Sequence, residues 1–270
     1  MKSNKQLWKA TGINMCIAVL VFAALLGLLW LIELIFPSLH GQLLHFERPQ
    51  TDDPVQLQAW WAWLIGIPAS VVGVGYILSI RDPQNYTGFY AGILMSLLLA
   101  MQFYWQRQYD STILYVCVFV PFQIKSILNW SKPTQESEPF SPSFLSLRNM
   151  LTSQVVFVLI VVADYLLATY LIAHNQLADD FWIKLFNGML IASSVLANYW
   201  LIYRKNDSWK YWLIYSVAGI CLFVLLGNIF SIVLFVFFYF INFTAGVSWF
   251  KSTPKHNYGW IDTKKKIREK

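Results

Sequence analysis

The chain has 270 residues, of which 57% are hydrophobic and only 13% are charged, and its mean hydropathy is +0.49. Because no ordinary soluble domain has this composition, the sequence predicts an all-α polytopic membrane protein. The net charge of +6 does not indicate nucleic-acid binding, since the basic residues fall in short loops between apolar runs and at the two ends. In those places basic residues indicate membrane orientation instead.

Eight apolar runs of about twenty residues predict eight transmembrane helices. The first run, 12–36, is too long for the apolar part of a signal peptide, so it is expected to remain as a helix. The polar segment 37–59 is expected outside the membrane, and 131–146 is expected to form the longest inner loop. The remaining predicted spans are 60–80, 86–105, 111–130, 151–173, 182–202, 209–226 and 229–250.

The stretch from Tyr211 to Phe250 contains no Asp, Glu, Lys, Arg or His. A single helix of this length would extend about 60 Å, twice the roughly 30 Å thickness of the bilayer hydrocarbon. The pair Gly227-Asn228 near its middle is a turn signal, so we expect two membrane helices joined by a tight hairpin. Asn242 lies midway along the second helix, where a polar side chain needs a partner or a ligand.

Lysine and arginine residues indicate the orientation of the helices, because they are retained on the cytoplasmic side. With the N-terminus inside, sixteen of these twenty residues lie in inner segments and only Arg48 and Arg107 lie in outer loops. Both termini are therefore predicted to be cytoplasmic. The other two, Lys125 and Lys184, lie near the ends of predicted spans, from which their side chains can snorkel to the surface.

The orientation reveals an internal repeat. Spans two to four (60–130) and spans six to eight (182–250) each begin outside and end inside, and the fifth span connects them. Aligning Trp130 with Trp249 at the ends of the two triplets places Gln123 opposite Asn242. We therefore predict two parallel three-helix repeats with one linking helix and one extra N-terminal helix, an architecture in which transporters hold substrate near the membrane midplane. The predicted regions are 1–59 (N-terminal helix and outer loop), 60–130 (first repeat), 131–173 (inner loop and linking helix), 182–250 (second repeat) and 251–270 (basic cytoplasmic tail).

The sequence contains neither a catalytic nor a metal-binding motif. The four histidines lie outside the predicted spans, and the three cysteines lie inside apolar runs without the spacing of metal ligands. We therefore predict no enzymatic activity, no metal site and no cofactor. Asp164, the one carboxylate deep in a predicted span, is by default a proton or ion site. A structural acid, hydrogen-bonded to a neighbouring hydroxyl or amide, is favoured here, and proton coupling is left open.

Amide side chains inside the predicted spans form the main candidate binding site. Gln123 and Asn242 lie about midway along their helices, Asn187 and Asn198 flank the middle of span six, and Gln102 lies near the outer end of span three. Amides offer hydrogen-bond donors and acceptors without charge, which suits a ligand with hydroxyl and carboxamide groups. The alternative is that these amides bond helix to helix, which contributes about 0.6–2 kcal/mol each.

Aromatic residues near these amides complete the candidate site. Most tryptophans fall near predicted membrane interfaces, but Trp182 and Trp212 accompany helix starts near the amides of spans six and seven. Aromatic faces stack on flat heterocycles, and a cationic ring gains about 0.5–2 kcal/mol from cation–π attraction. Depth counting places Trp182 toward the outside and Trp212 toward the inside, so one ligand meets both only if helices are broken or tilted, which Pro68 and Pro121 permit in the first triplet alone. The further candidates are Tyr90, Tyr215 and Tyr239.

Several segments match a known transporter family in their order and spacing. They are Asn85-Tyr86 opening span three, Gln106 to Trp130, Phe181-Trp182 opening span six, Arg204-Lys205 followed by Trp209-x-x-Trp212, and Trp249 closing the last helix. Over residues 60–250 the chain resembles the PnuC family of bacterial nicotinamide riboside transporters, whose fold is similar to a doubled SWEET-type sugar transporter.

The resemblance implies facilitated diffusion of nicotinamide riboside across the bacterial inner membrane, driven by phosphorylation of the substrate by a cytoplasmic kinase. It also implies that Trp182 and Trp212 contact the nicotinamide ring and that Gln123 bonds the ribose or the carboxamide. The chain departs from the family's pattern at Ile183 and at Lys125-Ser126. Relatives carry thiamine, riboflavin or deoxynucleosides, so these ligands are the alternatives, and a membrane-embedded enzyme or scaffold is less favoured. Self-association into a homo-oligomer is left open.

Overall fold

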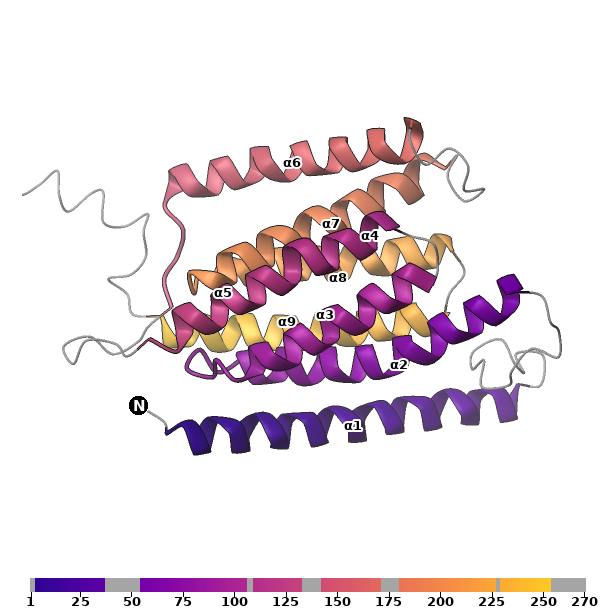
Figure 1. Ribbon diagram of the computed structural model, residues 1–270, viewed down its shortest axis with the longest axis horizontal. Coiled ribbons are helices and arrows are strands. Elements are labelled where there is room, and N and C mark those ends of the chain that lie inside the picture. Colours follow the sequence, from indigo (N-terminus) through magenta and orange to yellow (C-terminus); the bar gives the residue numbers. More distant parts are fainter. Residues whose placement is uncertain are drawn as a thin grey trace, which may run out of the picture. The chain divides into compact units, whose positions relative to one another are not determined.

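A computed structural model of the chain describes residues 3–36, 54–105, 109–132, 142–170, 180–226 and 229–253. Over these residues the backbone is helical apart from turns, short connections and an isolated bridge between Ser143 and Lys205. The prediction of an all-helical protein is therefore confirmed. The chain divides into two compact units, unit 1 (Met1–Lys132) and unit 2 (Pro133–Lys270), whose helices are labelled in Figure 1.

Eight helical segments correspond to the eight predicted spans. Among the described residues, seven segments are long and apolar enough to cross a membrane, and the second helix adds a shorter apolar stretch, Leu64–Ile80. Unit 1 contains α1 (Asn4–Ile35), α2 (Pro54–Ile80), α3 (Gly88–Trp105), α4 (Tyr109–Leu114), the π-helical turn η2 (Tyr115–Phe119) and α5 (Val120–Trp130). Unit 2 contains α6 (Leu147–Tyr170), α7 (Phe181–Ile202), α8 (Ser208–Leu225) and α9 (Ile229–Ser252).

The first helix begins at Asn4 rather than at the predicted residue 12. Ser3 and Gln6 form a capping box, in which Ser3 Oγ accepts a hydrogen bond from the Gln6 backbone N–H and Gln6 Oε1 accepts one from the Ser3 N–H. These two bonds satisfy backbone donors at the helix N-terminus. The polar first turns are therefore part of α1, although hydropathy alone does not indicate it.

One narrow stripe of α1 is buried, and its members are alternately four and seven residues apart. This spacing keeps them on one face of the helix, and α1 packs against α2. The stripe consists of Leu7, Thr11, Ala18, Phe22, Leu29 and Glu33. Glu33, near the end of the first predicted span, is only 6% exposed, so α1 also carries a buried carboxylate.

In unit 1, α3 packs against both α2 and α5. A glycine of α3 permits the close approach, since a Cβ on Gly92 would lie 2.9 Å from the Gln123 side chain of α5. At the end of α5 the Trp130 ring packs edge-on against Phe89 at the start of α3, with ring centroids 4.7 Å apart. The amide and the tryptophan of α5 are thus both held by α3.

The fourth predicted span, 111–130, is not one continuous α-helix. α4 passes into η2, after which the Val120 N–H bonds to the Tyr115 carbonyl five residues back. Pro121 follows directly and has no backbone N–H to donate. By contrast, α2 remains α-helical across Pro68. Of the two prolines that were expected to permit a break, Pro121 is therefore the one beside a change in helix type.

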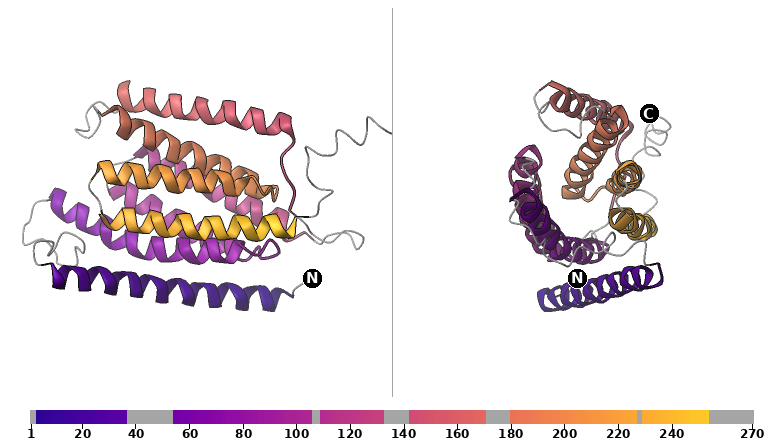
Figure 2. Two further views of the ribbon diagram at one scale, coloured as in Figure 1. Left: turned by 180° about the vertical axis from the view of Figure 1, so that it is seen from behind. Right: turned by 90° about the vertical axis from the view of Figure 1, so that its right-hand side faces the viewer.

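In unit 2, α8 packs against both α7 and α9, and α6 packs against α7. The left view of Figure 2 shows α8 between its two neighbours. α8 ends at Leu225 and α9 begins at Ile229, so the prediction that the uncharged stretch forms two helices is confirmed. The Gly227-Asn228 turn itself lies outside the described residues. Trp209 at the start of α8 packs edge-on against Trp249 near the end of α9, with centroids 5.6 Å apart.

The turn between α7 and α8 is tied to the segment that precedes α6. Ser143 donates its backbone N–H to the Arg204 carbonyl and accepts a hydrogen bond from the Asn206 N–H. The Leu145 N–H donates to Asp207 Oδ2 at 2.7 Å, and Lys205 Nζ donates to Ser143 Oγ at 2.7 Å. We call this set of contacts the unit 2 strap.

The corresponding turn in unit 1, between α2 and α3, is tied to α1. Thr11 Oγ1 lies 2.8 Å from Thr87 Oγ1 and accepts a hydrogen bond from Asn85 Nδ2 at 3.0 Å. Thr87 Oγ1 in turn donates to Asn85 Oδ1. These three side chains form the unit 1 strap, which is uncharged where the unit 2 strap is charged.

Candidate functional site

Asn242 of α9 meets Trp212 and Ser216 of α8 in the interior of unit 2. The Asn242 Nδ2 donates to Ser216 Oγ at 3.1 Å and to the Trp212 carbonyl at 3.4 Å. Trp212 and Ser216 are four residues apart, so both lie on the face of α8 that meets α9. Asn242 is 1% exposed and Trp212 is 6% exposed. The amide that the sequence singled out is therefore buried between two helices.

Two polar atoms of this contact are buried and have no hydrogen-bond partner among the described residues. They are the Oδ1 of Asn242 and the indole Nε1 of Trp212. An unpaired buried donor or acceptor costs about 1–3 kcal/mol, and native proteins pair nearly all of them. Asn242 and Trp212 therefore present one unpaired acceptor and one unpaired donor within the described part of unit 2.

Aromatic rings surround this contact within unit 2. The Trp212 ring is edge-on to Tyr215 with centroids 5.5 Å apart, and Tyr215 lies 5.3 Å from the Phe235 ring. Tyr239 is half-buried, and its ring stacks on Phe243 at 6.5 Å and 13°. The predicted residues Trp212, Tyr215, Tyr239 and Asn242 thus all lie on α8 and α9.

Gln123 occupies a similar contact in unit 1. It is buried, and its Nε2 donates to Tyr76 Oη of α2 at 3.2 Å. Gly92 of α3 lies directly against this amide. One turn further along α3, Ser96 is fully buried, and its hydroxyl has no hydrogen-bond partner within the described part of the chain.

Asn187 bonds to the intramembrane acid. Its Nδ2 donates to Asp164 Oδ2 of α6 at 3.2 Å, so Asp164 has the amide partner that the structural interpretation required. Lys184, one turn earlier on α7, is buried rather than snorkelling to the surface as expected. Its Nζ donates to Thr169 Oγ1 at 3.4 Å and lies over the Tyr165 ring. The polar residues of α7 in this region face α6.

Three other predicted residues make local or helix-packing contacts. Asn198 Nδ2 donates to the Ser194 carbonyl within α7 at 2.9 Å. Gln102 of α3 lies against Gly66 of α2, where an added Cβ would be 3.1 Å from its Nε2. Tyr90 is exposed, and its ring centroid lies 5.2 Å from that of Trp8 in α1.

Trp182 differs from Trp212 in its surroundings. Its side chain is 54% exposed, is edge-on to Phe181 and stacks on Phe186 at 6.2 Å. It begins α7, where Asp180 caps the helix by accepting from the Trp182 N–H at 2.7 Å. Of the two tryptophans expected to contact one nicotinamide ring, Trp182 is therefore exposed and Trp212 is buried.

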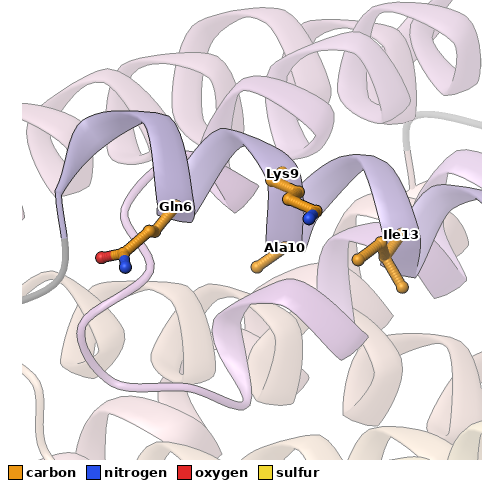
Figure 3. Close-up of a pocket in the computed structure, with 4 residues that line it drawn as sticks. All are labelled: Gln6, Lys9, Ala10 and Ile13. Carbon is orange, nitrogen blue, oxygen red and sulfur yellow. The ribbon is translucent and has the colours of Figure 1, made fainter.

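A surface hollow of about 290 Å³ lies along the first turns of α1. Figure 3 shows the side chains that line it, Gln6, Lys9, Ala10 and Ile13. None of the candidate residues is among them. The hollow is therefore separate from the contacts described above.

The sequence matches the family described as nicotinamide mononucleotide transporter over residues 63–251. That range is well over half of the chain. The chain belongs to this family. The family is one of membrane transporters, so the protein is a multi-pass transporter and not an enzyme.

A crystal structure of the vitamin B3 transporter PnuC has the same fold as this member of the family. The two share 17% sequence identity with a TM-score of 0.56, and the similarity covers 89% of this chain and 93% of that chain. A search of curated proteins found no match. The part that matches the family contains every candidate residue named above but not α1, so Thr11 of the unit 1 strap comes from outside it.

Tyr76 and Ser216, the partners of the two central amides, were not among the predicted site residues. The sequence could have indicated Ser216, because this residue follows Trp212 by one helical turn and therefore lies on the same face of the helix. Tyr76 and Gln123 lie on different helices, and nothing in the sequence indicates their contact.

Proposed function

We propose that this transporter carries nicotinamide riboside into the cytoplasm by facilitated diffusion. The observation that carries the proposal is the pair of buried unpaired atoms, Asn242 Oδ1 and Trp212 Nε1, the second of which belongs to a ring edge-on to Tyr215. A nicotinamide group offers a donor, an acceptor and a cationic ring that aromatic faces attract. The family's description and the vitamin B3 ligand of the structurally similar transporter support this class of ligand.

The uncharged surroundings favour the riboside over the mononucleotide. Residues 211–250, which supply Trp212, Tyr215 and Asn242, include no lysine, arginine or histidine. A buried phosphate without a cationic partner is strongly unfavourable. The ribose hydroxyls and the ring need only amides and aromatic faces. Phosphorylation by a cytoplasmic kinase would therefore trap the product and maintain the inward gradient.

The candidate residues fall into two groups. We assign ligand contact to Trp212, Asn242, Tyr215 and Tyr239 of unit 2, and to Trp182 as an exposed aromatic contact. We assign a smaller share to Gln123, because the neighbours described for it are Tyr76 and Gly92 rather than an indole with an unpaired N–H. We assign helix packing to Asn187, Asn198, Gln102 and Tyr90, whose contacts are described above.

We also propose that α2–α5 and α7–α9 are copies of one three-helix repeat, linked by α6. In each, the last helix carries a terminal tryptophan, Trp130 or Trp249, packed edge-on against an aromatic ring at the start of the middle helix. A buried amide precedes that tryptophan by seven residues in both.

We also propose placement in a bacterial inner membrane. The distribution of lysine and arginine supports an orientation with both termini in the cytoplasm.

Uptake of labelled nicotinamide riboside into proteoliposomes tests the function. We expect saturable uptake down the gradient that persists when a proton uncoupler is added. Empty liposomes and competition by thiamine, riboflavin and a deoxynucleoside serve as controls. Absence of uptake would end the transport proposal, and uptake abolished by the uncoupler would end facilitated diffusion. Stronger inhibition by one of the competitors than by unlabelled nicotinamide riboside would reassign the ligand.

A further inference from the structure

The amide of Asn242 is held in one orientation. Ser216 donates its hydroxyl proton to the Trp212 carbonyl at 2.9 Å, so its oxygen is available only as an acceptor, and it accepts from Asn242 Nδ2 at 3.1 Å. The same Nδ2 faces the Trp212 carbonyl at 3.4 Å, where an amide oxygen would be repelled. The Oδ1 of Asn242 therefore points away from both groups.

The fixed amide gives the site a defined hydrogen-bond pattern. Asn242 Oδ1 can only accept, and Trp212 Nε1 can only donate. Both are buried and unpaired within the described part of unit 2. A ligand that fails to match one of these atoms leaves that atom buried and unpaired, and such mismatches are strongly disfavoured.

A carboxamide is complementary to this pattern. It offers an N–H to Asn242 Oδ1 and a carbonyl oxygen to Trp212 Nε1. A carboxylate offers two acceptors and no donor at neutral pH, and a methyl ketone offers one acceptor and no donor. These three groups can be attached at one position of the same pyridinium riboside. The methyl ketone changes the hydrogen-bond pattern at constant charge, whereas the carboxylate also adds a negative charge.

We propose that Ser216 is a positioning residue that makes this site select a carboxamide, because it fixes Asn242 Oδ1 toward the ligand. The proposal rests on the proposed function, since it takes a nicotinamide-type ligand as the occupant. Ser216 itself does not touch the ligand. It acts through Asn242, whose amide would otherwise rotate and present its Nδ2 to an acceptor.

Binding to the wild-type protein provides the first test. Calorimetry compares nicotinamide riboside with 3-acetylpyridine riboside, which keeps the ring charge and the carbonyl but lacks the N–H, and with nicotinic acid riboside. We expect both analogues to bind at least about tenfold more weakly than nicotinamide riboside. Equal affinity for nicotinamide riboside and 3-acetylpyridine riboside would overturn the inference while leaving the proposed function intact. No binding of any of the three would overturn the proposed function, and the inference with it.

The second test concerns Ser216. In Ser216→Ala the preference for nicotinamide riboside over 3-acetylpyridine riboside should fall at least about threefold, because the amide loses one of its two partners. Ser216→Thr should keep the preference, since threonine can also bond to the carbonyl four residues back. The matched control is Ser193→Ala on α7, which removes a buried hydroxyl that bonds to the Met189 carbonyl. A wild-type preference in Ser216→Ala would overturn the proposal, and a lower folded fraction would not affect the ratio of two affinities measured on one preparation.

Discussion

The two units of the molecule bury the same kind of side chain and satisfy it differently. In unit 1 the Gln123 amide donates to the Tyr76 hydroxyl, and Gly92 lies against it. In unit 2 the backbone and ring of Trp212 lie beside the Asn242 amide, and both residues keep an unpaired polar atom among the described residues.

Burial of an amide therefore does not by itself identify a ligand contact. A glycine and a phenol close around Gln123 and use its donor for packing. Beside Asn242 lies Trp212, whose indole N–H is a second buried polar group without a partner among the described residues. The partners of the amide, not its depth in the membrane, decide whether it is available to a ligand.

Substitutions of Trp130 and Trp212 should have the largest effects, on stability for Trp130 and on ligand binding for Trp212. Trp130→Ala should lower the free energy of unfolding by about 3–5 kcal/mol, because it removes a fully buried ring that packs against Phe89. Trp212→Phe should change stability far less but weaken nicotinamide riboside binding about tenfold, since it removes the indole N–H and keeps a ring. Denaturant unfolding and calorimetry measure the two quantities. Wild-type affinity in Trp212→Phe would show that the indole N–H does not bind the ligand.

An intermediate effect compares the two amides directly. Asn242→Ala should weaken binding about tenfold, and Gln123→Ala only about two- to fivefold. The order should reverse for stability. Gln123→Ala leaves the buried Tyr76 hydroxyl without this partner and costs about 1–3 kcal/mol, whereas after Asn242→Ala the Ser216 hydroxyl keeps its bond to the Trp212 carbonyl. Binding and unfolding measured on both variants test the comparison. A larger binding loss for Gln123→Ala would place the main ligand contact in unit 1.

A small difference in the pH dependence of stability should distinguish the two straps. Burial lowers the pKa of the Lys205 amine in the unit 2 strap, while Asp207 acts in the opposite direction, and burial lowers the pKa of the Arg204 guanidinium to about 10. Because the folded pKa of Lys205 is below the unfolded one, the unfolded state binds more protons, and stability rises as pH increases through the folded pKa.

We therefore expect the wild-type protein to gain a few tenths of a kcal/mol relative to Lys205→Gln between pH 8 and pH 10, a small gain because Lys205 is partly exposed. Thr11→Val in the uncharged unit 1 strap should shift stability equally at every pH. Unfolding midpoints at pH 8, 9 and 10 measure this. Parallel wild-type and Lys205→Gln curves would contradict the lowered pKa.

Hydropathy and charge predicted the helices because membrane insertion depends on long apolar runs. The uncharged stretch 211–250 could only be two helices, and it forms α8 and α9. The early start of α1 was missed because a capping box made of Ser3 and Gln6 is polar and local. The change in helix type at η2 was predicted only at its end, where Pro121 follows. Nothing in the sequence indicates where η2 begins.

For the candidate site, the sequence indicated individual residues but not the partners that surround them. It named Asn242 and Trp212, but which atom of the Asn242 amide stays unpaired depends on Ser216, whose hydroxyl donates to the Trp212 carbonyl. Tyr90 was named as an aromatic candidate for the ligand site, yet its ring lies against Trp8, 82 positions earlier in the chain. Side-chain partners on other helices are set by packing that no single-helix pattern contains.

The π turn η2 affects how this chain aligns with its relatives. A π turn holds one residue more than an α-helical turn. A relative that lacks this residue would keep Gln123 and Trp130 facing α3 and would differ only in the turns before Tyr115. The correct alignment would then contain a one-residue gap in the middle of a membrane helix, where insertions and deletions are normally not placed.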